Sequence, residues 1–206
     1  MNIEDIKFNE KNMSFTIKLS NDELLKISYE IYEKFQLVKN FKLDSELYRT
    51  LKEEDSFNRA REIALRFATY KARTQYEVIN KLRQKNIDQK AIDKSIAYLK
   101  KQGYIDDKNY AKEFFRQCME VKNYSLQLTK MKFYQKGLDK SLFEDIISRS
   151  FSEDVEYENA LKLASKKIRN LNLNDIKDYR KAYSYLLSKG FSYELSKKVL
   201  DQLNHD

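Results

Sequence analysis

The 206-residue chain contains no proline, no tryptophan, one cysteine, one histidine and only three glycines. Cys118 has no partner for a disulfide within the chain, which fits a reducing compartment. His205 is the penultimate residue, where we expect a frayed end, so histidine-based triads and histidine metal clusters are excluded. The glycines stand too far apart for a phosphate-binding glycine loop. We therefore expect no catalytic residues, no metal, no cofactor and no enzyme activity.

Long apolar segments are also lacking. There is no run of 18 apolar residues and no apolar segment typical of a signal peptide at the start of the chain. Charged residues make up 35% and hydrophobic residues 41% of the chain, a balance typical of exposed helices around thin cores. These features predict a soluble, cytoplasmic protein that does not bind a membrane.

The glycines share one local pattern. Gly103, Gly137 and Gly190 each follow a helix-like run and precede one or two apolar residues and then Asp or Ser. Glycine tolerates the left-handed conformation that ends a helix, and the Asp or Ser oxygen caps the next helix. Asn86 and Asn123 occupy the same place in two further copies. The pattern predicts a string of helices joined by tight turns.

The turn pattern recurs at a regular spacing. Copies that begin at Lys85, Lys136 and Lys189 lie 51 and 53 residues apart, and apolar residues recur at matching offsets around them. This spacing predicts an elongated, mainly α-helical array of three three-helix repeats with a helix-turn-helix-like plan, over residues 56–105, 106–151 and 152–206. The expected helices are 59–72, 74–85 and 88–102, then 107–121, 125–136 and 139–149, then 152–171, 175–189 and 192–203.

Residues 1–55 differ from the repeats. Apolar and polar residues alternate from Met13 to Leu19 and again around Leu25 and Ile27, with a turn between them. This pattern predicts a small β-hairpin in an N-terminal extension. Asp44 is expected to cap a helix that runs through Lys52.

Positive charge is concentrated in the first repeat. Residues 56–105 hold 12 lysines and arginines against 4 acidic residues, whereas residues 1–55 carry a net charge of −3 and the last two repeats only +2 and +1. Lys90, Lys94 and Lys101 fall on one face of the helix expected over 88–102. Such a surface neutralises phosphates without reading sequence, although a solvated helix face has the same pattern. The residues predicted to bind nucleic acid or a filament are Lys71, Arg73, Lys81, Arg83, Lys85, Lys90, Lys94, Lys101, Lys132 and Lys136.

Other chemically suggestive residues have structural explanations. Asp106 and Asp107 stand where a helix must begin, so capping explains them better than a metal site. Cys118 lies among apolar residues and is expected in a core. Most phenylalanines fall at core positions of the repeats, namely Phe114, Phe115, Phe133, Phe143 and Phe191. Tyr70, Tyr76 and Tyr134 lie near basic residues and remain candidates for stacking on single-stranded nucleic acid.

The sequence resembles the RecX regulatory proteins, modulators of the RecA recombinase, over residues 59–203. The resemblance rests on three sequence motifs. The first is Ala64-Leu65 with Lys71-Ala72-Arg73-Thr74 and Glu77, and the second is Gly103-Tyr104-Ile105-Asp106-Asp107 with Tyr110-Ala111. The third is Lys189-Gly190-Phe191-Ser192-Tyr193-Glu194. The resemblance implies a monomer that lies along the groove of the RecA filament on single-stranded DNA. There it would limit ATP hydrolysis, strand exchange and co-protease activity in recombination, repair and the SOS response. The basic first repeat would face phosphates of single-stranded DNA, with double-stranded DNA as a further ligand, and the near-neutral later repeats would meet protein.

Two other classes of function fit the residues. One is a helix-turn-helix regulator that binds duplex DNA, although the helix over 88–102 opens with acid and offers mainly lysine rather than base-reading residues. The other is a protein-only helical adapter, which predicts no salt-sensitive binding of nucleic acid.

Overall fold

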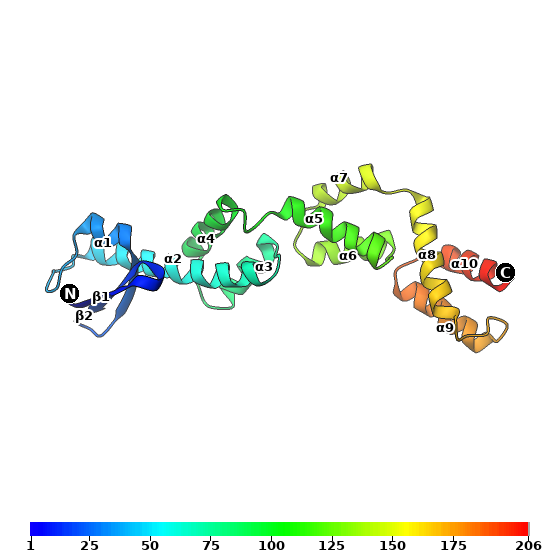
Figure 1. Ribbon diagram of the computed structural model, residues 1–206, viewed down its shortest axis with the longest axis horizontal. Helices are drawn as coiled ribbons and strands as arrows, with labels where there is room; N and C mark the ends of the chain where they lie inside the picture. Colours follow the sequence, from blue (N-terminus) through cyan, green and yellow to red (C-terminus); the bar gives the residue numbers. More distant parts are fainter. Residues whose placement is uncertain (206) are drawn as a thin grey trace. The chain divides into compact units, whose positions relative to one another are not determined.

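A computed structural model describes residues 1–205 (Figure 1). The side chains of Asn12 and His205 lie outside the described part. The backbone of His205 is described and belongs to the last helix, so the frayed end expected there is not observed. The chain divides into two compact units, Met1–Ile105 and a second that begins at Asp106. It is mainly α-helical with a small antiparallel sheet near the N-terminus, as the sequence predicts.

The first unit begins with a three-stranded antiparallel sheet in the order β1-β2-β3, formed by Ile3–Asn9, Ser14–Leu19 and Leu24–Ser28. The hairpin of β2 and β3 confirms the prediction, whereas β1 and the helix α1, Tyr29–Phe35, were not predicted. The register of β1 shifts between Ile3 and Asp5, and this irregularity breaks the alternation that marks a strand in sequence. The buried core of this part comprises Ile3, Phe15, Ile17, Leu19, Leu25, Ile27, Leu37, Leu43 and Leu51.

Helix α2 runs without a break over Ser45–Tyr70, so the prediction of one helix through Lys52 and a second over 59–72 is wrong. The polar residues between the two predicted helices bond to the sheet instead of forming a turn. The Asp55 carboxylate accepts a hydrogen bond of 2.6 Å from the Lys26 amide, and the Asn58 side chain donates one of 3.2 Å to the Lys26 carbonyl. Both residues thereby satisfy the backbone of β3. Burial raises the pKa of the Asp55 carboxyl group.

Helices α3, Gln75–Arg83, and α4, Gln89–Lys101, pack on the second half of α2. Small residues on α2 (Ala60, Ala64 and Ala68) let the three helices approach closely. The predicted Thr74–Glu77 capping box begins α3, and the Asp88 carboxylate caps α4 and accepts a hydrogen bond from the Ser56 hydroxyl. That bond lowers the pKa of Asp88 and joins the start of α4 to the middle of α2.

The second unit contains α5, Asp107–Arg116, the π-helical turn η2, Gln117–Val121, α6, Leu126–Gln135, and α7, Lys140–Ser150. These are followed by α8, Glu153–Ile168, α9, Ile176–Ser188, and α10, Tyr193–His205. The Asp106 carboxylate accepts a bond of 2.9 Å from the Asn109 amide, which confirms its predicted role as a cap. Of the phenylalanines predicted in the core, Phe115, Phe133, Phe143 and Phe191 are buried, whereas Phe114 is only half-buried. Among residues 1–205, no helix combines the length and apolar character that crossing a membrane requires.

Five helix ends have the left-handed residue that the sequence predicts, since φ is positive at Asn86, Gly103, Asn123, Gly137 and Gly190. In each case the chain turns sharply and a capping residue starts the next helix within a few residues. The spacing of helices along the sequence is therefore set by these turns.

Two of the turns in the second unit dock against each other. The Ser125 amide donates a hydrogen bond of 3.2 Å to the Lys189 carbonyl. A Cβ atom at Gly190 would lie 2.8 Å from the Cβ of Leu128 and 3.1 Å from its amide nitrogen, so only glycine fits this approach. The Glu156 carboxylate accepts a bond of 3.0 Å from the Leu126 amide at the same end of α6.

We predict that Gly190→Ala destabilises the second unit by about 2–4 kcal/mol, because it adds a steric clash to the cost of a left-handed alanine. Gly103→Ala is the matched control, since its φ of +74° is similar but nothing lies within 4 Å of the added Cβ. The control should lose only about 1–2 kcal/mol. Urea unfolding followed by circular dichroism measures both, and equal losses would contradict the steric argument.

Cys118 is fully buried, as predicted, and burial raises the pKa of its thiol. We expect a thiol-specific chromogenic disulfide to label it roughly 100-fold more slowly in the native protein than in urea, because the reactive thiolate is scarce and shielded. Rapid labelling of the native protein would place Cys118 at an accessible surface.

Candidate nucleic-acid interface

A groove with an apolar floor and a basic rim lies between α2 and α3 in the first unit. Its volume is about 420 Å³, and its lining residues are Glu62, Ile63, Arg66, Phe67, Tyr70, Lys81 and Lys85. Tyr70 is 87% exposed at the end of α2, so its ring is open to a ligand. Aromatic and basic side chains side by side can contact the bases and phosphates of a single strand.

Arg73 differs from the other predicted binding residues because its guanidinium is used by the fold. Its guanidinium carbon lies 4.1 Å from the centre of the Phe67 ring, and its side chain pairs with Glu77 at 3.8 Å. Its Nε atom is buried and has no hydrogen-bond partner in the described part of the chain. The Lys81 ammonium lies 5.7 Å from the same ring and remains at the edge of the groove. Arg73 thus supports the groove floor, and Lys81 and Lys85 form the accessible rim.

The predicted lysines of α4 lie on its exposed face, opposite the buried Ile92, Ile96 and Leu99. Lys90 is bound to the Glu53 carboxylate on α2 at 2.6 Å, which lowers the pKa of Glu53. Lys94 and Lys101 are exposed and do not line the groove between α2 and α3.

Two further predicted residues flank the helices just described. Lys71 is exposed at the end of α2. Arg83, also exposed, donates a hydrogen bond of 3.2 Å to the Gln89 side chain.

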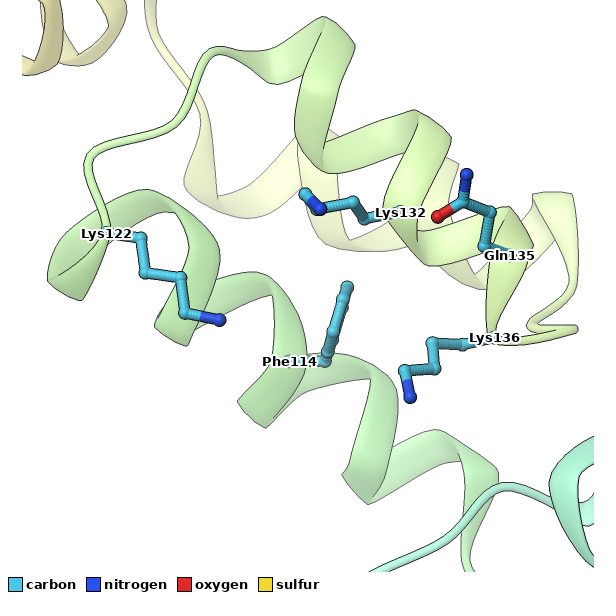
Figure 2. A pocket seen from close by; sticks show the side chains of 5 residues that line it. All are labelled: Phe114, Lys122, Lys132, Gln135 and Lys136. Carbon is cyan, nitrogen blue, oxygen red and sulfur yellow. The ribbon is translucent and has the colours of Figure 1, made fainter. Parts of the chain in front are cut away.

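A second groove, of about 410 Å³, lies in the second unit. Figure 2 shows Phe114 and Lys122 on one side and Lys132, Gln135 and Lys136 on the other, all around one space. The structure therefore brings together Lys132 and Lys136, the two predicted residues outside the first repeat. Phe114, expected in the core, instead contributes to this surface.

Two cations that line the grooves, Arg66 and Lys122, were not predicted from the sequence. For Lys122, the sequence does contain a pattern that could have indicated the site. Lys85, Lys122, Lys136 and Lys189 each stand immediately before a residue with positive φ. A lysine at a helix end offsets the negative end of the helix dipole, and this explanation hides any further role of the position.

The arrangement offers charge and aromatic surface rather than reactive groups. Among the described side chains, which do not include that of His205, no group of three histidine, cysteine or acidic residues is placed to hold a metal ion. The cysteine is buried with a raised pKa, which removes a ready nucleophile. Both grooves present ammonium or guanidinium groups beside an aromatic ring, an arrangement whose chemistry suits an anion.

Comparisons with known proteins agree with the sequence resemblance. Residues 60–99 match the model for the first three-helix domain of RecX, and residues 154–200 match that for the third. A solved structure of a regulatory protein RecX has a TM-score of 0.71 and 23% identity over 97% of this chain and 98% of its own, which supports the fold. RecX from Lactobacillus salivarius has a TM-score of 0.60 and 27% identity over 74% of this chain and 99% of its own.

Relatives among curated proteins cover most of the chain. The regulatory protein RecX of Clostridium botulinum is 33% identical over 89% of this chain and 87% of its own. That of Finegoldia magna is 36% identical over 97% of this chain and 98% of its own. Since such identity extends along nearly the whole of both chains, this protein belongs to the RecX family of regulatory proteins.

Proposed function

We propose that this protein binds the RecA filament on single-stranded DNA and inhibits its ATPase, strand-exchange and co-protease activities. The observation that carries the proposal is the groove of the first unit, in which Arg66, Lys81 and Lys85 surround an aromatic floor in a chain of the RecX family. These side chains suit a single strand whose phosphates meet the cations and whose bases meet Phe67 and Tyr70.

The charge distribution supports a contact with phosphates rather than with a particular base sequence. Residues 56–105 carry a net charge of +8, and their cations are mainly lysines, which act as point charges. Helix α4 is capped by Asp88, whose carboxylate is bonded to Ser56 and to the Ala91 amide. Gln89, the amide side chain of its first turn that is suited to reading a base, is hydrogen-bonded to Arg83 and Asp93. This arrangement favours a filament modulator over a helix-turn-helix regulator of duplex DNA.

A series of small modules suits a filament because each contact can be weak. We propose that residues 1–55, 56–105, 106–151 and 152–206 act as such modules, since the buried residues gather in four clusters that follow one another along the chain. Several modules on one filament raise the total affinity through effective concentration. A monomer that uses several modules would span more than one RecA subunit and oppose the changes that accompany ATP hydrolysis.

We expect the protein to lower the DNA-dependent ATPase of RecA at amounts well below one per RecA subunit, because one chain bound along the filament affects several subunits. The measurement is ATP hydrolysis on single-stranded DNA, with binding of the protein to the same DNA in parallel. Unchanged hydrolysis despite salt-dependent DNA binding would favour the duplex-binding regulator. No effect in either assay would favour the protein-only adapter.

Neutralising the rim of the first groove with Arg66→Gln, Lys81→Gln and Lys85→Gln should raise the concentration for half-inhibition about 10-fold or more, since three phosphate contacts are lost. Arg66 lies 3.7 Å from the Glu62 carboxylate, but this exposed pair is weak, so a phosphate can replace it. The matched control removes three exposed charges from the same unit, with Lys11→Gln, Lys39→Gln and Lys42→Gln. We expect the control to change half-inhibition less than about 3-fold, because its charges lie outside the contact and are screened by salt. Equal effects of the two variants would mean that the groove contributes only net charge.

A further inference from the structure

Four lysines of the second unit converge on two tyrosine rings. The ammonium groups of Lys122, Lys132 and Lys189 lie 5.8, 5.8 and 5.6 Å from the centre of the Tyr124 ring. Any two of them are therefore separated by no more than about twice that distance. We call these residues, with Tyr124, the Tyr124 cluster.

A second ring extends the Tyr124 cluster. The Lys189 ammonium also lies 5.2 Å from the centre of the Tyr185 ring, and that of Lys167 lies 5.3 Å from it. Attraction to the ring faces holds these cations in place.

No carboxylate neutralises these cations. Within residues 1–205, none of Lys122, Lys132, Lys167 and Lys189 forms an ion pair. Other lysines of the unit do pair on their own helices, as in Lys140–Glu144, Lys162–Glu158 and Lys181–Asp178. Some of the acidic residues that make the unit nearly neutral thus pair with lysines on their own helices. The positive charge of the Tyr124 cluster is therefore not cancelled by them.

The backbone fixes the Tyr124 cluster in place. Lys122 and Tyr124 lie in the turn before α6, and Lys189 ends α9, where the Ser125 amide donates to the Lys189 carbonyl. The close approach at Gly190 fixes the same contact. Like charges held together by a scaffold repel each other, and a bound anion removes this repulsion without first ordering the site.

The Tyr124 cluster is continuous with the second groove because Lys122 and Lys132 belong to both. Lys136 and Phe114 lie on the groove side, and Lys189 with Tyr185 lies on the other. Cations and rings that alternate in this way are typical of surfaces that follow a single-stranded backbone.

We propose that the Tyr124 cluster is a second site for the phosphodiester backbone of single-stranded nucleic acid, distinct from the groove of the first unit. This inference deepens the proposed function and rests on it for the origin of the strand. A nucleic acid fits better than an acidic protein segment because the cluster presents ammonium groups around two half-buried rings.

The test is binding of the full chain, without RecA, to a fluorescent oligothymidylate of about 20 nucleotides at several salt concentrations. In the combined variant Lys122→Gln, Lys132→Gln and Lys189→Gln, the slope of log affinity against log salt should become shallower by about 2, since each lost phosphate contact contributes about 0.7. Affinity near 0.1 M salt should fall about 100-fold.

The control variant carries Lys140→Gln, Lys162→Gln and Lys181→Gln, which removes the same charge from lysines already paired with carboxylates. Its slope should change by less than about 0.5. Replacing the three cluster lysines with arginine should retain the original slope. Circular dichroism establishes that all three variants are folded.

Equal slopes for the cluster and control variants would overturn the inference. In a parallel measurement with poly-glutamate as an acidic polypeptide, a cluster variant that loses poly-glutamate binding but keeps oligothymidylate binding would also overturn it. A cluster variant that loses its effect on RecA but keeps its slope would also overturn it, because the cluster would then contact protein while the proposed function stands. If the wild-type protein leaves RecA unaffected but the slope falls in the cluster variant, the proposed function fails and the nucleic-acid site remains.

Discussion

The left-handed residue that ends a helix is the constraint on which the structure of this RecX family member depends. Positive φ at Asn86, Gly103, Asn123, Gly137 and Gly190 turns the chain back so that short helices can bury their apolar faces. Without proline, the chain has few other means to end a helix. At every one of these turns except that of Gly103, a lysine stands just before the left-handed residue, at a helix end where it offsets the helix dipole. Fold and charge placement therefore have one cause.

Much of the fold was predictable because these turns are local. A left-handed Gly or Asn and a capping Asp, Ser or Thr act within a few residues, so the sequence showed most helix boundaries in the second unit and α3 and α4 in the first. The continuity of α2 was not predictable, since Asp55 and Asn58 resemble turn residues until β3 supplies the backbone groups that they bind. Strand β1 was missed for a related reason, because its irregular register depends on pairing with β2.

The candidate site was less predictable because charge counts ignore pairing. The first repeat holds most of the net charge, yet Arg73 supports the fold and Lys90 is bound to Glu53. The second unit is nearly neutral by sequence, yet pairing on single helices leaves Lys122 and Lys189 without a carboxylate among residues 1–205. Which cations remain available depends on contacts between segments far apart in the chain. A sum of the charges in one segment cannot show these contacts.

Exposure and pairing separate the structural cations from the available ones. The guanidinium carbon of Arg73 lies 4.1 Å from the centre of the Phe67 ring, and the Nε atom of Arg73 is buried. To bind a phosphate, this guanidinium would have to leave its contact with the ring. The ammonium groups at 5.6–5.8 Å from Tyr124 make weaker contacts and can gain a phosphate without losing the ring. Lysine suits such a site because its flexible stem lets several point charges meet one anion, whereas a planar guanidinium is better fixed by a single partner. Arginine under the first groove and lysine around Tyr124 therefore fit the roles proposed for these positions, support in one and reversible binding in the other.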